Sequence, residues 1–372
     1  ATGAGSRNPL QARASTDKIV MQLRNIAIIA HVDHGKTTLV DQLLAQSGAF
    51  RANEATVERA MDSNDQERER GITILAKCTS VLWSGEAGET RINIIDTPGH
   101  ADFGGEVERI LGMVDGCVLL VDAEEGVMPQ TKFVLGKALK MGLRPILCLN
   151  KVDRPHADPD RVLNDAFDLF AAMGATDEQL DFPHIYASGK NGWATLDMAK
   201  PNADLAPLFD LIVRHVPPPA ASQRSEAPFR ILSVLIENDP FLGRLLTGRI
   251  DSGKAVPGLA IRALSRDGQE IERGRITKVL AFRGLKRQPI DDAEAGDIVA
   301  IAGLSKATVA DTLCAMDVTE ALPAQPIDPP TISMTVSVND SPLAGREGDK
   351  VQSRVIRDRL LKEAQSNVAI RV

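Results

Sequence analysis

The chain has 372 residues and a formal net charge of −7, and 43% of its residues are hydrophobic. At roughly 100–200 residues per domain, this length predicts two or three domains. The acidic balance argues against a protein coated evenly in positive charge for nucleic acid, although a local basic face remains compatible with it. No apolar run approaches the roughly 18–20 residues that span a bilayer, so we expect no membrane partner and a cytoplasmic protein.

The first stretch, residues 1–21, is small, polar and without periodicity. Two interpretations stay open. Residues 1–20 are a leader or tag remnant before a functional start at Met21, or they are the remnant of a transit peptide, because they contain Arg and Ser but few acids.

Five near-continuous apolar runs follow from residue 22: RNIAIIA, RINIIDT, CVLLVDA, RPILCLN and FPHIYAS. They alternate with helical patterns, which predicts an α/β domain over residues 22–216 with a parallel sheet covered by helices. The stretch from Asp158 has a helix-start signal and an apolar stripe that we assign to the core. Its members are Val162, Phe167, Phe170 and Met173. The four cysteines are far apart and are expected to be reduced, with neither a disulfide framework nor a zinc site.

The pattern changes after a proline-rich linker at residues 217–227. Short β-rich runs divided by Gly, Asp-Gly and Pro turns predict an antiparallel β-barrel over residues 228–320. A second linker, residues 321–329, precedes TISMTVSVND and a helical pattern. We therefore expect residues 330–372 to be the start of an α+β ferredoxin-like third domain that is incomplete.

The stretch AHVDHGKTTL, residues 30–39, lies between the first strand and a helix, where a phosphate-binding loop is expected. Ala30 replaces the first glycine of the usual pattern, and a small residue should serve there. Gly35 lets the backbone approach the phosphates, Lys36 bridges the β- and γ-phosphates, and the Thr37 hydroxyl binds Mg²⁺. Backbone N–H groups at the helix start complete the cradle. The expected contacts are Asp33, His34, Gly35, Lys36, Thr37 and Thr38.

Three further motifs follow in order. DTPGH places Asp96 at a strand end to hold Mg²⁺ and the Gly99 N–H near a γ-phosphate. In NKVD, Asp153 can accept two hydrogen bonds from guanine, a pair that adenine cannot offer. ASGKNG supplies Ser188 to orient Asp153 and a backbone N–H for the guanine oxygen. The expected contacts from these last two motifs are Asn150, Lys151, Val152, Asp153, Ser188, Gly189 and Lys190.

The charged segment before RGITI reads as a solvated helix or loop for most of its length. At its end, Thr73 stands where a loop could coordinate Mg²⁺ through its hydroxyl when GTP is bound. Together with the motifs above, this segment resembles the translational GTPases. MDSNDQERERGITI, VDAEEGVMPQTKFVLGKAL and NDSPLAGREG resemble the TypA/BipA family more closely, and the likeness runs from about residue 22 to the last residue.

The resemblance implies functions for residues that the spacing alone leaves open. His100 corresponds to the residue that orients the attacking water when the ribosomal sarcin-ricin loop engages it, and Val32 and Ile72 correspond to an apolar gate beside it. Asp33 corresponds to a position that can hold a monovalent cation. The His34 ring is given no role, since its backbone N–H is the expected contact.

The hypothesis is therefore a ribosome-associated GTPase that acts as a monomer in translation, ribosome assembly or stress adaptation. One alternative is a nucleotide-dependent ribosome-binding scaffold whose output does not need hydrolysis, and another is a translocation factor like elongation factor G or LepA. A basic set in the barrel could meet ribosomal RNA, although a solvated barrel edge explains it equally well. Its members are Arg273, Arg275, Lys278, Arg283, Lys286 and Arg287.

Overall fold

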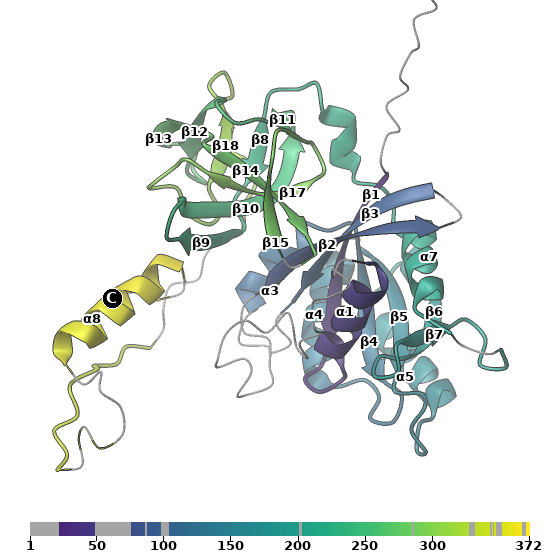
Figure 1. Cartoon of the computed structure of the whole chain (residues 1–372). Coiled ribbons are helices and arrows are strands. Elements are labelled where there is room, and N and C mark those ends of the chain that lie inside the picture. The colour runs from purple at the N-terminus through teal and green to yellow at the C-terminus, as the bar shows by residue number, and fades with distance from the viewer. Residues whose placement is uncertain are drawn as a thin grey trace, which may run out of the picture.

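The computed structural model describes residues 22–48, 76–85, 88–97, 104–200, 203–284, 286–326, 332–342, 344, 346, 352–366 and 370–372. An α/β domain comes first along the chain, an antiparallel β domain follows it, and a helix lies near the C-terminus (Figure 1). The predicted sequence of an α/β domain followed by an antiparallel β domain is therefore confirmed.

A seven-stranded sheet forms the centre of the α/β domain, in the order β2-β3-β1-β4-β5-β6-β7. The five predicted apolar runs are its parallel strands, and antiparallel β2 and β7 close the two edges. The two edge strands were missed because β2 mixes polar and apolar residues without a continuous apolar run of the length seen in the central strands, and because β7 is very short. The strands are β1 (Gln22–Ala30), β2 (Lys77–Gly85), β3 (Gly88–Asp96), β4 (Gly116–Asp122), β5 (Arg144–Asn150), β6 (His184–Ser188) and β7 (Trp193–Thr195).

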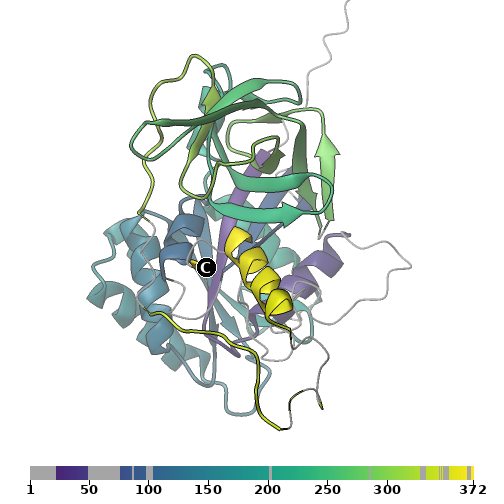
Figure 2. The same ribbon diagram turned by 90° about the vertical axis from the view of Figure 1, so that its left-hand side faces the viewer.

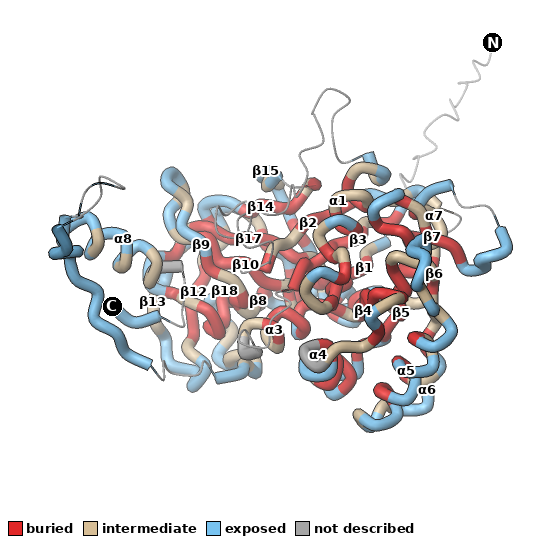
Figure 3. The backbone as a smooth tube through the Cα atoms, turned by 90° about the horizontal axis from the view of Figure 1, so that it is seen from below, coloured by how far each residue is buried: buried red, intermediate tan, exposed pale blue. Residues whose placement is uncertain are grey.

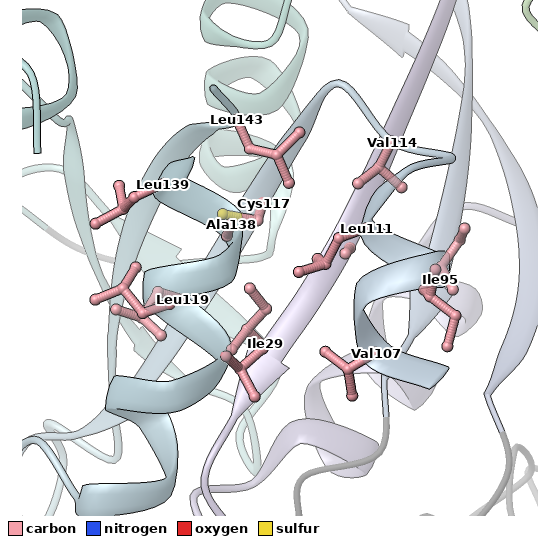
Figure 4. Close-up of a cluster of buried hydrophobic side chains, with 14 of the residues drawn as sticks. Ile29, Ile95, Val107, Leu111, Val114, Cys117, Leu119, Ala138, Leu139 and Leu143 are labelled. Atoms are coloured by element: carbon pink, nitrogen blue, oxygen red, sulfur yellow. The ribbon is translucent and has the colours of Figure 1, made fainter. Parts of the chain in front are cut away.

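Helices cover both faces of this sheet because its central strands are apolar on both sides. Along β1, Ala27 and Ile29 contribute to one buried cluster, while Ile26 and Ile28 contribute to the other. Figure 4 shows the first cluster, where α3 and α4 pack on the strands. The helices of the domain are α1 (Lys36–Gln46), α3 (Gly104–Leu111), α4 (Pro129–Lys140), α5 (Pro159–Ala172), α6 (Asp177–Leu180) and α7 (Ala206–His215).

The helix predicted after Asp158 is α5, and the Asp158 carboxylate caps it by accepting the Arg161 N–H at 3.1 Å. The predicted apolar stripe of α5 was wrong at one position. Phe167 is 47% exposed, whereas Leu169 is buried. Phe167 still lies near Phe182, with 6.5 Å between the ring centroids, so it packs at the margin of the core.

The second domain is built from antiparallel strands around a third buried cluster. Its main sheet has nine strands, and β11 and β16 form a separate pair. A short 3₁₀ helix, η2 (Ala220–Arg224), lies in the expected linker. The strands are β8 (Arg230–Leu232), β9 (Leu235–Asp239), β10 (Gly243–Ser252), β11 (Lys254–Ala255), β12 (Ala260–Leu264), β13 (Glu270–Arg275), β14 (Lys278–Arg283), β15 (Lys286–Ile290), β16 (Ala293–Glu294), β17 (Ile298–Ala302) and β18 (Thr312–Ala315).

Polar side chains join the two domains where β1 and β3 meet the loop before β17. The Asn25 side-chain amide donates to the Gly296 carbonyl at 2.9 Å and to the Asp115 carboxylate at 3.1 Å. The neighbouring Asn93 amide donates to Asn25 at 2.9 Å and to Asp297 at 3.1 Å. Both asparagines are buried, and one of the two hydrogen bonds that each amide donates depends on the second domain being in this position.

Apolar packing continues across the same boundary. Val234, Phe282 and Ile298 of the second domain belong to the buried cluster that lines one face of the first sheet. Figure 3 shows buried segments, coloured red, in the strands of both domains. The two domains therefore share part of one core.

The C-terminal piece differs from what the sequence predicts. No strand forms over residues 332–340, because no strand among the described residues pairs with that segment to supply backbone hydrogen bonds. Ile332 and Met334 are 81% and 83% exposed. The predicted helix is present as α8 (Ser353–Ser366), which lies beside β9 (Figures 1 and 2). None of the helices in the described ranges is long and apolar enough to cross a membrane.

The domain boundary can be tested at Arg249, whose guanidinium lies 2.8 Å from the Asp115 carboxylate. Burial raises the pKa of Asp115, and Arg249 counters that shift. We expect Arg249→Met to lower the free energy of unfolding by about 2 kcal/mol at neutral pH, because a carboxylate with little solvent contact loses its cation. Urea denaturation measures this loss.

The matched control is Arg354→Met, which removes an exposed ion pair with Asp358 on α8 and should cost less than about 0.5 kcal/mol. Adding Asp115→Asn to Arg249→Met should recover part of the loss, since the neutral amide needs no cation. Equal costs for the two arginine variants would contradict the importance of this boundary contact.

Candidate functional site

The loop between β1 and α1 has two residues in the left-handed backbone region, Asp33 with φ 65° and Gly35 with φ 91°. A Cβ atom on Gly35 would lie 2.6 Å from the Asn150 Nδ2 atom. The close neighbour is therefore the side chain of Asn150, the last residue of β5. Glycine is required at this position both by the backbone angle and by the contact with Asn150.

Lys36 and Asp96 meet at the carboxyl ends of β1 and β3. The Lys36 Nζ atom lies 2.6 Å from Asp96 Oδ1 and also donates to the Thr97 carbonyl. Asp96 is fully buried and Lys36 is 8% exposed. The Thr97 hydroxyl donates to the Ile28 carbonyl at 2.8 Å, which ties the end of β3 to β1. The predicted phosphate-binding lysine and the predicted metal-binding carboxylate are therefore brought together.

The donor chemistry here fits Mg²⁺. Asp96 offers carboxylate oxygen, and Thr37 offers a hydroxyl in the first turn of α1. Within the described ranges, no group of three or more His, Cys, Asp or Glu side chains could hold a metal. Mg²⁺ needs no such cage, because it is usually bound by one or two protein oxygens together with substrate phosphates and water.

Asn150 connects three loops at the end of β5. Its Nδ2 atom donates to the His34 carbonyl at 2.8 Å, and its Oδ1 atom accepts the Gly189 N–H at 2.8 Å. Asn150 is 2% exposed, so these bonds form away from water. The phosphate loop and both predicted guanine loops thus take their positions from one side chain.

Asp153 and Ser188 are brought close, but a third residue lies between them. The Asn191 Nδ2 atom donates to Asp153 Oδ2 at 3.2 Å and to Ser188 Oγ at 2.9 Å. Sequence reasoning assigned the orienting role to Ser188 alone and missed Asn191. The sequence feature that could have identified Asn191 is its position three residues after Ser188, in the turn that ends at Gly192.

The remaining predicted contacts lie around the rim of this edge, half-buried or exposed: Val32, Asp33, Thr37, Thr38, Val152 and Lys190. The structure therefore gathers the predicted residues of the phosphate loop and of both guanine loops. Four predicted residues lie outside the described ranges: Ile72, Thr73, Gly99 and His100.

The His34 ring has a structural contact that sequence reasoning did not assign. The ring is fully buried, its Nδ1 atom lies 3.3 Å from the Asp122 backbone nitrogen, and its Nε2 atom lies 3.4 Å from the Glu125 carboxylate. Burial lowers the pKa of His34, so the ring is neutral at pH 7 and Nδ1 accepts the Asp122 N–H. The predicted contact, the His34 N–H, instead faces the His31 carbonyl at 3.3 Å in a turn.

The basic set of the barrel is largely engaged within the protein. Arg273 pairs with Glu270 at 2.6 Å, Arg275 donates to the Gly258 carbonyl at 3.0 Å, and Arg287 pairs with Glu237. The two ion pairs reduce the charge that Arg273 and Arg287 can offer to a phosphate backbone, whereas the carbonyl contact of Arg275 leaves its charge in place. The contacts therefore favour the interpretation of a solvated barrel edge for Arg273 and Arg287.

Comparison with known proteins adds family evidence to this geometry. Residues 21–218 match the family described as "Elongation factor Tu GTP binding domain", and residues 243–314 match "Elongation factor Tu domain 2". The chain is 53% identical over 352 residues to the "Large ribosomal subunit assembly factor BipA" of Synechocystis sp., which covers 95% of this chain and 58% of that protein. The protein of the same name from Bacillus subtilis is 51% identical over 355 residues, with 95% and 57% covered.

A solved structure shares the fold. The crystal structure of a protein from Thermus thermophilus superposes with a TM-score of 0.68 at 18% identity, over 94% of this chain and 62% of that one. The chain spans somewhat more than half the length of the curated relatives it matches.

The contact between Gly35 and Asn150 gives a direct test. We expect Gly35→Ala to weaken GDP binding at least tenfold, because the added Cβ both strains the left-handed backbone and displaces the Asn150 amide. Isothermal titration calorimetry measures the affinity. The control is Gly48→Ala, which also has a positive φ of 72° but open space around the added atom. It should lose some stability and keep its GDP affinity within about twofold, and equal weakening in both variants would contradict the contact.

Proposed function

The chain belongs to the family of translational GTPases that carry the elongation factor Tu GTP-binding domain, on its TypA/BipA branch, and we propose that it binds and hydrolyses GTP. The observation that supports the proposal best is Asn150, which bonds to both the phosphate loop and the loop after β6. That contact sets the phosphate-binding and base-binding loops at one sheet edge, as a purine nucleoside triphosphate requires.

In the proposed reaction, water attacks the γ-phosphorus of GTP in line with the bond to the β–γ bridging oxygen, which breaks to release GDP and phosphate. Lys36 and the N–H groups at the start of α1 offset the charge that develops on the phosphate oxygens. Thr37, Asp96 and Thr73 would hold Mg²⁺, which supplies further charge neutralisation when bound. The resemblance assigns the orientation of the attacking water to His100, beside an apolar gate of Val32 and Ile72, and a monovalent cation to the position of Asp33.

Asp153 is the residue that we propose recognises the guanine base. Its carboxylate can accept the ring N–H and the exocyclic amine of guanine, and its bond from Asn191 supports that orientation. The stem of Lys151 can lie over the base plane. Ser188 supports Asp153 indirectly, because the Ser188 hydroxyl accepts another hydrogen bond from the Asn191 amide.

Base selectivity tests this assignment. We expect the chain to bind GDP at least a hundredfold more tightly than ADP. Asp153→Asn should weaken GDP binding at least tenfold and strengthen XDP binding, because the amide can donate to the C2 carbonyl oxygen that xanthine has in place of the guanine amine. Calorimetry with the three diphosphates measures these affinities, and Asp197→Asn, at an exposed carboxylate outside the site, is the control. Equal affinities for GDP and ADP in the unmodified chain would refute a guanine site.

The proposed partner is the ribosome, with the sarcin-ricin loop as its activating element. The name of the relatives, large ribosomal subunit assembly factor, supports an assembly function over the translocation alternative. Because the ribosome is the proposed partner, the proposed place of action is the cytoplasm, with the protein acting as a monomer. Partner stimulation in comparable switches raises the rate by on the order of 10⁵.

Ribosome stimulation is measured as GTP turnover with and without 70S ribosomes, with the Bacillus subtilis relative assayed in parallel. We expect slow turnover alone and strong stimulation when the ribosome docks. His100→Ala should abolish the stimulation and keep GDP affinity within about twofold. Stimulation that persists in His100→Ala would remove the catalytic assignment. A His100→Ala variant that lacks turnover but still supports ribosome assembly would instead favour the scaffold alternative.

A further inference from the structure

Asp122, the last residue of β4, has a fully buried side chain at the edge where the candidate site lies. Its carboxylate is 2.6 Å from the Lys151 Nζ atom and 3.6 Å from Arg154, and it accepts the Glu124 N–H at 2.8 Å. Burying a carboxylate together with two cations costs desolvation free energy that an apolar side chain of similar size would not cost. Asp122 is therefore a candidate for a role beyond packing.

Lys151 connects this carboxylate to the phosphate loop. The same Nζ atom that contacts Asp122 also donates to the Asp33 carbonyl at 2.6 Å. Both Lys151 and Asp33 have left-handed backbones, with φ of 61° and 65°. Non-glycine residues hold such angles only where surrounding contacts impose them, and the shared ammonium is one such contact.

A second contact leaves Asp122 through its backbone. The Asp122 N–H is accepted by the Nδ1 atom of the buried His34 ring at 3.3 Å. The His34 carbonyl in turn accepts the Asn150 amide at 2.8 Å. Asp122 therefore reaches the phosphate loop by its backbone through His34, and reaches the guanine loop by its carboxylate through Lys151.

The protonation state of Asp122 suits its contacts with the two cations. Burial alone would raise the pKa of Asp122, but the Lys151 ammonium and the Glu124 N–H outweigh burial and hold the pKa below its ordinary value. The carboxylate is thus charged at pH 7, and it can hold the Lys151 ammonium against the Asp33 carbonyl.

We propose that Asp122 is a positioning residue for guanine-nucleotide binding, which acts through Lys151 to hold the phosphate loop and the guanine loop in one relative geometry. The inference rests on the proposed function of this edge. Asp122 needs no contact with the nucleotide for this effect. Its absence should loosen the ground-state complex rather than slow the chemical step, because both loops bind the substrate before reaction.

The test variant is Asp122→Asn, which keeps the shape of the side chain and the oxygen that accepts the Glu124 N–H, and replaces the charged oxygen facing Lys151 with a neutral amide nitrogen. We expect the Kd for GDP to rise about tenfold to a hundredfold and the KM for GTP to rise in parallel, with kcat changed less than threefold. Calorimetry and steady-state turnover measure these values. The matched control is Glu124→Gln, which neutralises a partly exposed carboxylate 3.4 Å from the same Arg154 and should keep the GDP affinity within twofold.

A double-mutant cycle with Lys151→Met separates positioning from a general loss of structure. If Asp122 acts through Lys151, adding Asp122→Asn to Lys151→Met should weaken GDP binding by no more than about twofold further. Additive losses would overturn the inference. An Asp122→Asn variant with unchanged GDP affinity would overturn it as well.

Two outcomes remain to be distinguished. If the unmodified chain does not bind GDP, the proposed function fails and the inference falls with it; if it binds GDP tightly and Asp122→Asn binds equally well, only the inference fails. Should Asp122→Asn not fold, Asp122→Glu keeps the charge and displaces it by one methylene group. The same rise in Kd is expected for that variant, and an unchanged Kd would again overturn the inference.

Discussion

The parallel pairing of β1 with β3 and β4, and of β4 with β5, is the constraint on which the candidate site depends. Parallel strands end at the same edge of a sheet, so residues far apart in sequence meet there. Lys36 and Asp96 are sixty positions apart, yet their charged atoms are 2.6 Å apart. The buried clusters on both faces maintain the pairing, since each strand contributes apolar side chains to both.

Polar contacts then fix the relative positions of the loops at that edge. Asn150 and Lys151 both reach back to the phosphate loop, to the carbonyls of His34 and Asp33. These bonds are protected from water to different degrees, with Asn150 buried and the Lys151 side chain 17% exposed. A nucleotide that bridges the loops would meet a geometry that the protein has already organised, which lowers the ordering cost of binding.

The second domain is held by the same strands on the side of the sheet away from the nucleotide edge. Asn25 lies in β1, a few residues before the phosphate loop, and its amide bonds to the Gly296 carbonyl. Asn93 holds the matching place in β3, before Asp96, and bonds to Asp297. The strands that carry the predicted phosphate and metal ligands thus also anchor the barrel. A shift of either strand would therefore change both the nucleotide edge and the contact between the domains.

The sequence by itself determined the local features: five apolar strands, the glycine-containing phosphate loop, the capped helix after Asp158 and the change to short antiparallel runs after residue 228. These follow from backbone preferences and periodicity, which act over a few residues. Tertiary structure alone decided that Asn191 lies between Ser188 and Asp153, that the His34 ring is buried against Asp122, and that Phe167 is exposed. Such outcomes depend on which distant side chains share a space and on which charges lose water together, and no spacing along the chain encodes either.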